Sequence, residues 1–145
     1  MSSAMTDRNF SLEHFVKAQN GVYEVALAEI KAGSKRSHWM WFIFPQLAGF
    51  GHSAMALRYA INSEAQALTY LAHPILGYRY RACVSALEGL TDTTVEIVLG
   101  PLDAMKLRSS LTLFAEASDN SQIVTALDRW FGAKDRATLR LLGRD

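Results

Sequence analysis

The stretch Asp103-Ala-Met-Lys106-Leu-Arg-Ser-Ser110-Leu-Thr-Leu-Phe114 indicates both the fold class and where to look for a function. A helix winds at ~100° per residue, so Asp103, Lys106 and Ser110 share a face with the apolar residues of this stretch. Three polar residues take the opposite face, namely Arg108, Thr112 and Glu116. Burying an unpaired lysine or aspartate is costly. We therefore expect these inward residues either to be paired or to line a wet, concave site.

The same helical period continues on both sides of this stretch. From an N-cap at Ser11, apolar residues recur every three or four positions until Gly33, which predicts one long helix. Gly21 lies on its outer face, where it weakens the helix by ~1 kcal/mol relative to Ala; a kink at Gly21 is the alternative. Further helices are expected over Ala54 to Ile61, Ile75 to Leu90, Thr93 to Leu99, from an Asp103 cap onward, Ser121 to Phe131 and Asp135 to Leu142. Another is expected from a capping box at Ser63 to a point before Pro74. The fold prediction is an all-α, single-domain multihelical array of seven or eight helices.

Length and charge limit the functions that the chain can have. The 145 residues suit one domain with a sizeable core, and we expect a disordered tail over 1–9 and a single helical domain over 10–145. Lys and Arg total 15 against 14 Asp and Glu, so no global charge favours nucleic acid or a membrane surface. The single Cys83 excludes an intramolecular disulfide, and Met1 to Ser11 lack a signal-peptide pattern. A cytoplasmic protein is expected.

The segment Lys35-Arg-Ser-His38-Trp39-Met-Trp41-Phe-Ile-Phe-Pro-Gln46 does not fit the helical pattern. Its apolar run is too short for periodicity to distinguish a helix from an extended chain. One interpretation is a hydrophobic plug with solvated basic residues at its mouth. The other is that Lys35, Arg36 and His38 sit where the chain enters the core. There, flanked by aromatic residues such as Trp39 and Trp41, they would hold a planar or anionic ligand by charge and stacking.

Several long and unusual motifs carry a family resemblance. They are Phe15-Val-Lys-Ala-Gln19, Gly33 to Gln46, Tyr70-Leu-Ala-His73-Pro74-Ile-Leu-Gly77 and Asp103 to Phe114. With these motifs the chain resembles a widespread bacterial family of small cytoplasmic domains of unknown function, often mislabelled calpastatin. The resemblance spans roughly Phe10 to Leu142 and implies an all-helical single domain without an established activity.

The candidate site residues each have a structural alternative. Asp103 fits a helix N-cap, Lys106 can pair with it, and Ser110 can bond the carbonyl of Lys106. Gln19 can tie the first helix to a backbone carbonyl, and the helix dipole can account for Glu64. As a functional set, the candidates for catalysis are His38, Asp103 and Glu64. The candidates for ligand binding are Gln19, Lys35, Trp39, Trp41, Lys106 and Ser110.

Most common chemistries find no support in the sequence. There is no Gly-rich phosphate loop, no His spacing typical of a metal site and no nucleophile elbow, so we expect no metal and no cofactor. We also expect no membrane contact. Sequence-specific binding of nucleic acid is not expected either, because the outer face of the Asp103 helix offers only Arg108 as a basic residue.

Two hypotheses remain. One is a domain that binds, or processes, a small anionic, aromatic or nucleotide-like ligand; the alternative is a non-enzymatic protein-interaction module whose buried polar residues are structural. The sequence does not fix the oligomeric state.

Overall fold

The computed structural model describes residues 11–144, which form ten α-helices and no strand. The predicted all-α class is confirmed, but seven or eight helices was too low a count for this range. The tail predicted over 1–9 lies outside the described residues. The helices are α2 (Glu13–Gln19), α3 (Tyr23–Lys31), α4 (Met40–Ile43), α5 (Ala54–Arg58), α6 (Glu64–Ala72), α7 (Leu76–Glu88), α8 (Val95–Leu99), α9 (Pro101–Ser118), α10 (Ser121–Phe131) and α11 (Arg136–Leu141).

The single helix expected from Ser11 to Gly33 is two helices, α2 and α3, which meet at Gly21. The backbone of Gly21 has a φ of +76°, in the left-handed region that an α-helix does not use. The N-cap of α2 is Leu12, although the Ser11 hydroxyl accepts a hydrogen bond from the Glu13 N–H. Gly21 therefore lies in the turn that joins two helices, and it is not a destabilising glycine inside one helix.

The helix predicted to start at an Asp103 cap starts earlier. Its N-cap is Gly100, with a φ of +88°, and Pro101 occupies the first turn, where a proline needs no hydrogen-bond partner for its nitrogen. Asp103 therefore lies inside the first turn of α9 and does not cap it. This shift frees its carboxylate for side-chain partners.

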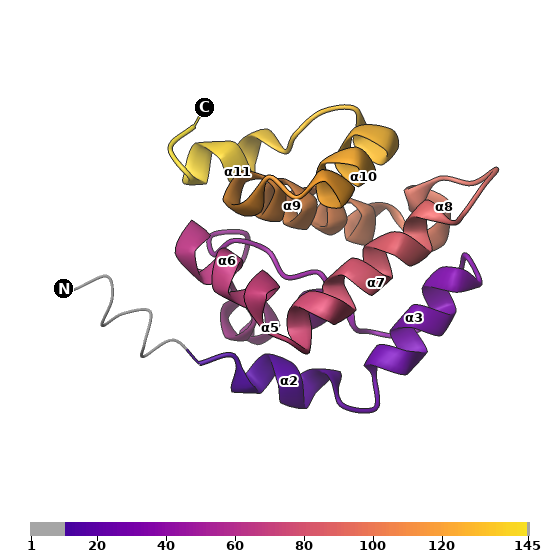
Figure 1. Cartoon of the computed structure of the whole chain (residues 1–145), viewed down its shortest axis with the longest axis horizontal. Coiled ribbons are helices and arrows are strands. Elements are labelled where there is room, and N and C mark those ends of the chain that lie inside the picture. The colour runs from indigo at the N-terminus through magenta and orange to yellow at the C-terminus, as the bar shows by residue number, and fades with distance from the viewer. Residues whose placement is uncertain (1–10, 145) are drawn as a thin grey trace.

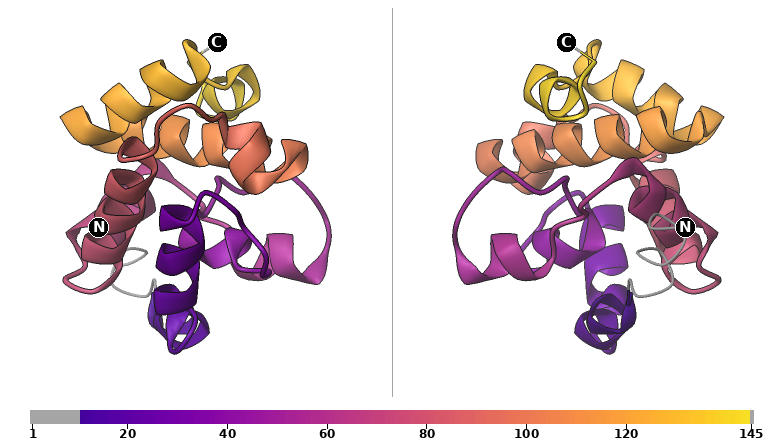
Figure 2. Two further views of the ribbon diagram at one scale, coloured as in Figure 1. Left: turned by 90° about the vertical axis from the view of Figure 1, so that its right-hand side faces the viewer. Right: turned by 90° about the vertical axis from the view of Figure 1, so that its left-hand side faces the viewer.

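Helix α9 is the centre of the molecule. It packs against α6, α8, α10 and α11, and every residue from Ser109 to Ala115 is buried. Figure 2 shows α9, α10 and α11 as an upper layer above the helices of the N-terminal part. The face of α9 that carries Arg108 and Thr112 was expected to point to solvent. It does not, because α11 and the turn before it fold back over that face and bury Thr112.

The interface between the two layers is filled with aromatic rings from distant parts of the chain. Tyr70 on α6 and Tyr80 on α7 meet Phe114 of α9, with ring centres 5.4 and 4.6 Å away. Such packing binds the layers more strongly than the buried area alone. Cys83 lies in the same core, and burial raises the pKa of its thiol to about 12.

Residues 48–60 form a loop whose two ends are joined. The Ala48 N–H donates to the Ile61 carbonyl at 2.8 Å, and the Ile61 N–H donates to the Gln46 carbonyl at 2.9 Å. An isolated parallel bridge between Leu47 and Ile61 marks the same neck, and it is the only β-type pairing in residues 11–144. The loop contains α5 (Figure 1), and the Tyr59 ring that follows α5 packs against Phe42 of α4 with ring centres 5.3 Å apart. Among the described residues no helix is long and apolar enough to cross a bilayer.

Candidate functional site

An ion-pair cluster joins the segment before α4 to the first turn of α9. The Asp103 carboxylate lies 2.9 Å from Lys35 Nζ and 3.3 Å from Lys106 Nζ. The Lys35 side chain is only 9 % exposed, whereas that of Lys106 is 25 % exposed. One carboxylate thus serves two ammonium groups, and the cluster retains one formal positive charge.

The two lysines lie over two different tryptophans. Lys106 Nζ is 3.9 Å from the centre of the Trp41 ring, and Lys35 Nζ is 5.0 Å from that of Trp39. The short helix α4 explains the arrangement, because it carries Trp41 and follows directly on Trp39. Trp41 is half-buried and reaches the surface, but Trp39 is fully buried. Of the two rings only Trp41 reaches the surface, and a ligand that stacks on it must use ring surface that Lys106 does not cover.

Glu29, which the sequence reasoning did not single out, holds the segment that carries Lys35 and Trp39. Its carboxylate accepts hydrogen bonds from the Arg36 and Ser37 N–H groups, the Ser37 hydroxyl and the Trp39 indole. Burial would raise the pKa of this carboxyl, but these donors outweigh it and lower the pKa to about 2. The sequence did not indicate this role of Glu29, because no local pattern shows that residues 36–39 fold back to contact α3.

A cleft of about 270 Å³ opens beside Trp41 and Lys106. Its walls come from α4, the 46–50 segment, α9 and the N-cap of α11. The lining residues are Trp41, Gln46, Phe50, Leu102, Met105, Lys106, Arg108, Ser109 and Asp135. Two cations, a half-buried indole and one carboxylate therefore face a common space.

Arg108 is the second cation of the cleft, and sequence reasoning placed it on the solvent face. Its Nε donates to the Ala133 carbonyl and its Nη2 to the Lys134 carbonyl, both at 3.1 Å. These bonds use only part of its five N–H donors. Within residues 11–144 no carboxylate lies within ion-pair distance of Arg108, so the guanidinium is fixed in place but its charge is not neutralised. This position of Arg108 could not be predicted from the sequence, because the carbonyl that its Nε bonds belongs to a turn 25 residues away.

The carboxylate of the cleft is engaged in a local network. Asp135 caps α11 by accepting from the Thr138 N–H at 3.0 Å, and it also accepts from the Thr138 and Ser109 hydroxyls. The Asp135 N–H in turn donates to the Thr112 hydroxyl at 2.9 Å. Asp135 therefore fixes the wall of the cleft, and all three of these donors bond the same oxygen, Oδ2.

Two predicted ligand-binding residues lie elsewhere, in the core. The Gln19 amide donates to the Phe42 carbonyl at 2.7 Å and to the Tyr70 hydroxyl at 3.1 Å, while its oxygen accepts from Arg79. This matches the structural alternative for Gln19. Ser110 shares a 2.9 Å hydrogen bond with the Tyr80 hydroxyl and does not bond the Lys106 carbonyl. Burial raises the pKa of both tyrosines above the ordinary value.

Glu64 and His38 are also apart from the cleft. Glu64 is ion-paired with Arg144 near the C-terminus, at 2.7 Å. The His38 side chain is exposed and lines none of the cavities described here. Five of the candidates, namely Gln19, His38, Asp103, Lys106 and Ser110, would have to surround one cavity to form a single site, and none of the cavities lined by residues 11–144 brings them together.

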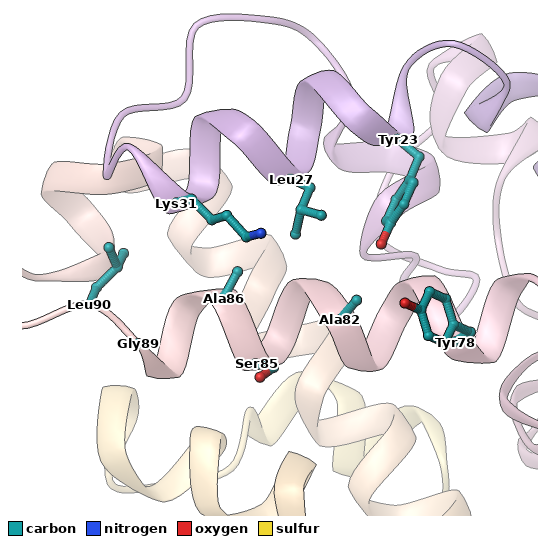
Figure 3. A pocket seen from close by; sticks show the side chains of 9 residues that line it. All are labelled: Tyr23, Leu27, Lys31, Tyr78, Ala82, Ser85, Ala86, Gly89 and Leu90. Atoms are coloured by element: carbon teal, nitrogen blue, oxygen red, sulfur yellow. The ribbon is translucent and has the colours of Figure 1, made fainter.

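A larger groove of about 440 Å³ runs between α3 and α7, as Figure 3 shows. Tyr23, Leu27 and Lys31 of α3 face small residues of α7, including Ala82 and Ala86. None of the predicted site residues lines it, and Lys31 is its only charged residue. Residues 11–144 also hold no group of three or more His, Cys, Asp or Glu side chains suited to a metal ion.

The fold and the cleft define a class, a small all-helical domain with a cationic and aromatic surface cleft. The family model "Protein of unknown function (DUF1810)" matches residues 9–142, so the chain belongs to that family, and the resemblance predicted from the motifs is confirmed. The structure is similar to the conserved hypothetical protein Rv1873 from Mycobacterium tuberculosis, with 45 % identity, a TM-score of 0.90, and coverage of 92 % of this chain and 97 % of that one. No curated protein matches the chain.

Proposed function

We propose that this domain binds a small anionic ligand that carries an aromatic ring, in the cleft between α4 and α9. One observation carries the proposal: Lys106 and the unneutralised Arg108 face the same cleft as the half-buried Trp41 ring. Bidentate guanidinium contacts suit carboxylate and phosphate oxygens, and an indole face suits a planar ring.

The electrostatic balance of the cleft also favours an anion. Lys35 and Lys106 share one carboxylate, and Arg108 adds a further positive charge. Among the described lining residues, Asp135 supplies one negative charge against the two positive charges of Lys106 and Arg108. An incoming anion would find donors on Arg108, which has no carboxylate partner within residues 11–144, and on Lys106, which makes the longer of the two contacts to Asp103.

The size of the cleft favours a small ligand. Its volume of about 270 Å³ is just below the usual range for ligand pockets of roughly 300–1,000 Å³. A mononucleotide or an aryl phosphate is of suitable size, whereas a dinucleotide would extend far beyond the walls.

A thermal-shift titration tests the proposal with defined probes. Phenyl phosphate and the nucleoside 5′-monophosphates should raise the melting temperature, because a ligand at 100 times its Kd stabilises the folded state by about 2.7 kcal/mol. Inorganic phosphate, which lacks the ring, should act more weakly. Trp41→Leu and Lys106→Met should reduce the shift, and Lys17→Met, an exposed lysine on α2 away from the cleft, should not.

The rim of the cleft supports a second candidate, the protein-interaction module. Leu102 and Met105 project from α9 with 74 % and 68 % of their surface exposed. Exposed apolar side chains of this kind are found where partners bind. If none of the probes stabilises the protein, this candidate is favoured, and Leu102→Ser with Met105→Ser would then be the variant for partner-binding measurements.

A further inference from the structure

Gln46 lines the cleft with a side-chain amide that has no hydrogen-bond partner among residues 11–144. It lies directly after Pro45, beside Trp41, and it lines both the main cleft and a small side pocket behind the Trp41 ring. Its backbone carbonyl accepts from the Ile61 N–H and holds the neck of the 48–60 loop. Its side-chain amide makes no hydrogen bond to any residue in the described range, 11–144.

The other two buried or half-buried glutamines of the N-terminal half behave differently. Gln19 is bonded to Phe42, Tyr70 and Arg79, and the Gln66 oxygen accepts from the Asn62 N–H. In both cases the amide is part of the fold. Gln46 has the same chemical group in a partly accessible position, next to a ring on which a ligand can stack, and with its donors and acceptor unused.

We infer that Gln46 reads the edge of a nucleobase, and that the ligand class is therefore a nucleoside monophosphate. An amide presents a donor and an acceptor side by side, which matches ring edges that carry an adjacent acceptor and donor, as glutamine does with adenine. Trp41 stacks on the base, Gln46 bonds its edge, and Lys106 with Arg108 binds the phosphate. This inference rests on the proposed function, since it assigns the specificity of the same cleft.

The variant Gln46→Leu isolates the edge contact. Leucine keeps a similar volume and leaves the backbone bond to Ile61 in place, so the neck of the loop should be retained. We expect Gln46→Leu to weaken the best nucleoside monophosphate about tenfold, as the loss of one or two neutral hydrogen bonds implies. Affinity for phenyl phosphate, which has a ring and a phosphate but no polar ring edge, should stay within about twofold.

Isothermal titration of wild type and variants with both probes distinguishes the outcomes. Wild type that binds both probes equally, or Gln46→Leu that keeps its affinity for nucleotides while Trp41→Leu loses it, would overturn the role of Gln46 and leave the proposed function standing. Wild type that binds neither probe would overturn both. Circular dichroism and the melting temperature of each unliganded variant show that the variant is folded, and Lys17→Met, an exposed site on α2, is the control away from the cleft.

Discussion

Lys35 Nζ lies 2.9 Å from Asp103 Oδ2, and this contact joins the segment before α4 to the first turn of α9 across 68 residues of sequence. This contact also determines how much the loss of Lys106 would destabilise the protein. Asp103 keeps its shorter and more buried partner when Lys106 is lost, so the carboxylate is not left unpaired.

Lys35→Met is therefore expected to destabilise the protein more than Lys106→Met. The first should cost about 2 kcal/mol, because it leaves a half-buried carboxylate with only its longer contact. The second should cost less than about 1 kcal/mol, as for other partly exposed pairs. Chemical denaturation of both variants without ligand measures the difference, and equal losses would contradict the assignment of Lys35 as the principal partner.

The Glu29 carboxylate should make part of the stability dependent on pH. Its pKa is lowered from 4.5 to about 2, so its contribution is complete above about pH 4.5 and is lost as the pH falls toward 2. Glu29→Gln should cost about 1–2 kcal/mol at neutral pH, since charged hydrogen bonds become neutral ones. In urea titrations the difference in unfolding free energy between the two proteins should narrow below about pH 4.5 and close only near pH 2. A gap that does not depend on pH would show that the charge of Glu29 is unimportant.

Gly21→Ala should destabilise the protein by about 1 kcal/mol, because alanine is strained at positive φ. Nothing lies within 4 Å of the added methyl group, so the effect comes from the backbone alone. A continuous helix from Ser11 to Gly33 would have given the opposite sign. Gly89→Ala is the matched control, since Gly89 has a φ of −76° and room for a methyl group. Thermal unfolding of the two variants provides the comparison.

Gly77→Ala should be far more damaging, for a steric reason. A Cβ at Gly77 would lie 1.9 Å from the Leu71 carbonyl oxygen, where α6 and α7 are in closest contact. Neither backbone can yield without moving its helix, and the loss should reach about 3 kcal/mol or more. A melting temperature within a few degrees of wild type would show that this contact is looser than described.

The helices could be predicted from the sequence where the signal is local. The bounds of α10 and the Ser63 cap of α6 follow from turn and capping residues and were predicted correctly. The break at Gly21 was only the alternative to one long helix, because an apolar stripe continues through it and only the backbone angle reveals the turn. The start of α9 was also missed, because an aspartate near a helix start resembles a cap.

The candidate site was predictable only in part. Lys35, Trp41, Asp103 and Lys106 were singled out, and the structure brings them together. Arg108 was assigned to solvent, because a helical period shows which residues share a face but not which distant element covers it. Gln19 and Ser110 were expected at the same site for the same reason. An inward polar residue is visible in a sequence, whereas its partner is not.

The burial of Cys83 gives this chain a built-in kinetic reporter. It is the only cysteine, and a thiol with a pKa near 12 has almost no thiolate to react with at neutral pH while the core is closed. Labelling by a thiol reagent therefore measures how often the α7 region opens. Slower labelling in the presence of a nucleotide would report binding without any engineered probe, and a ligand that leaves the rate unchanged would bind without protecting the core.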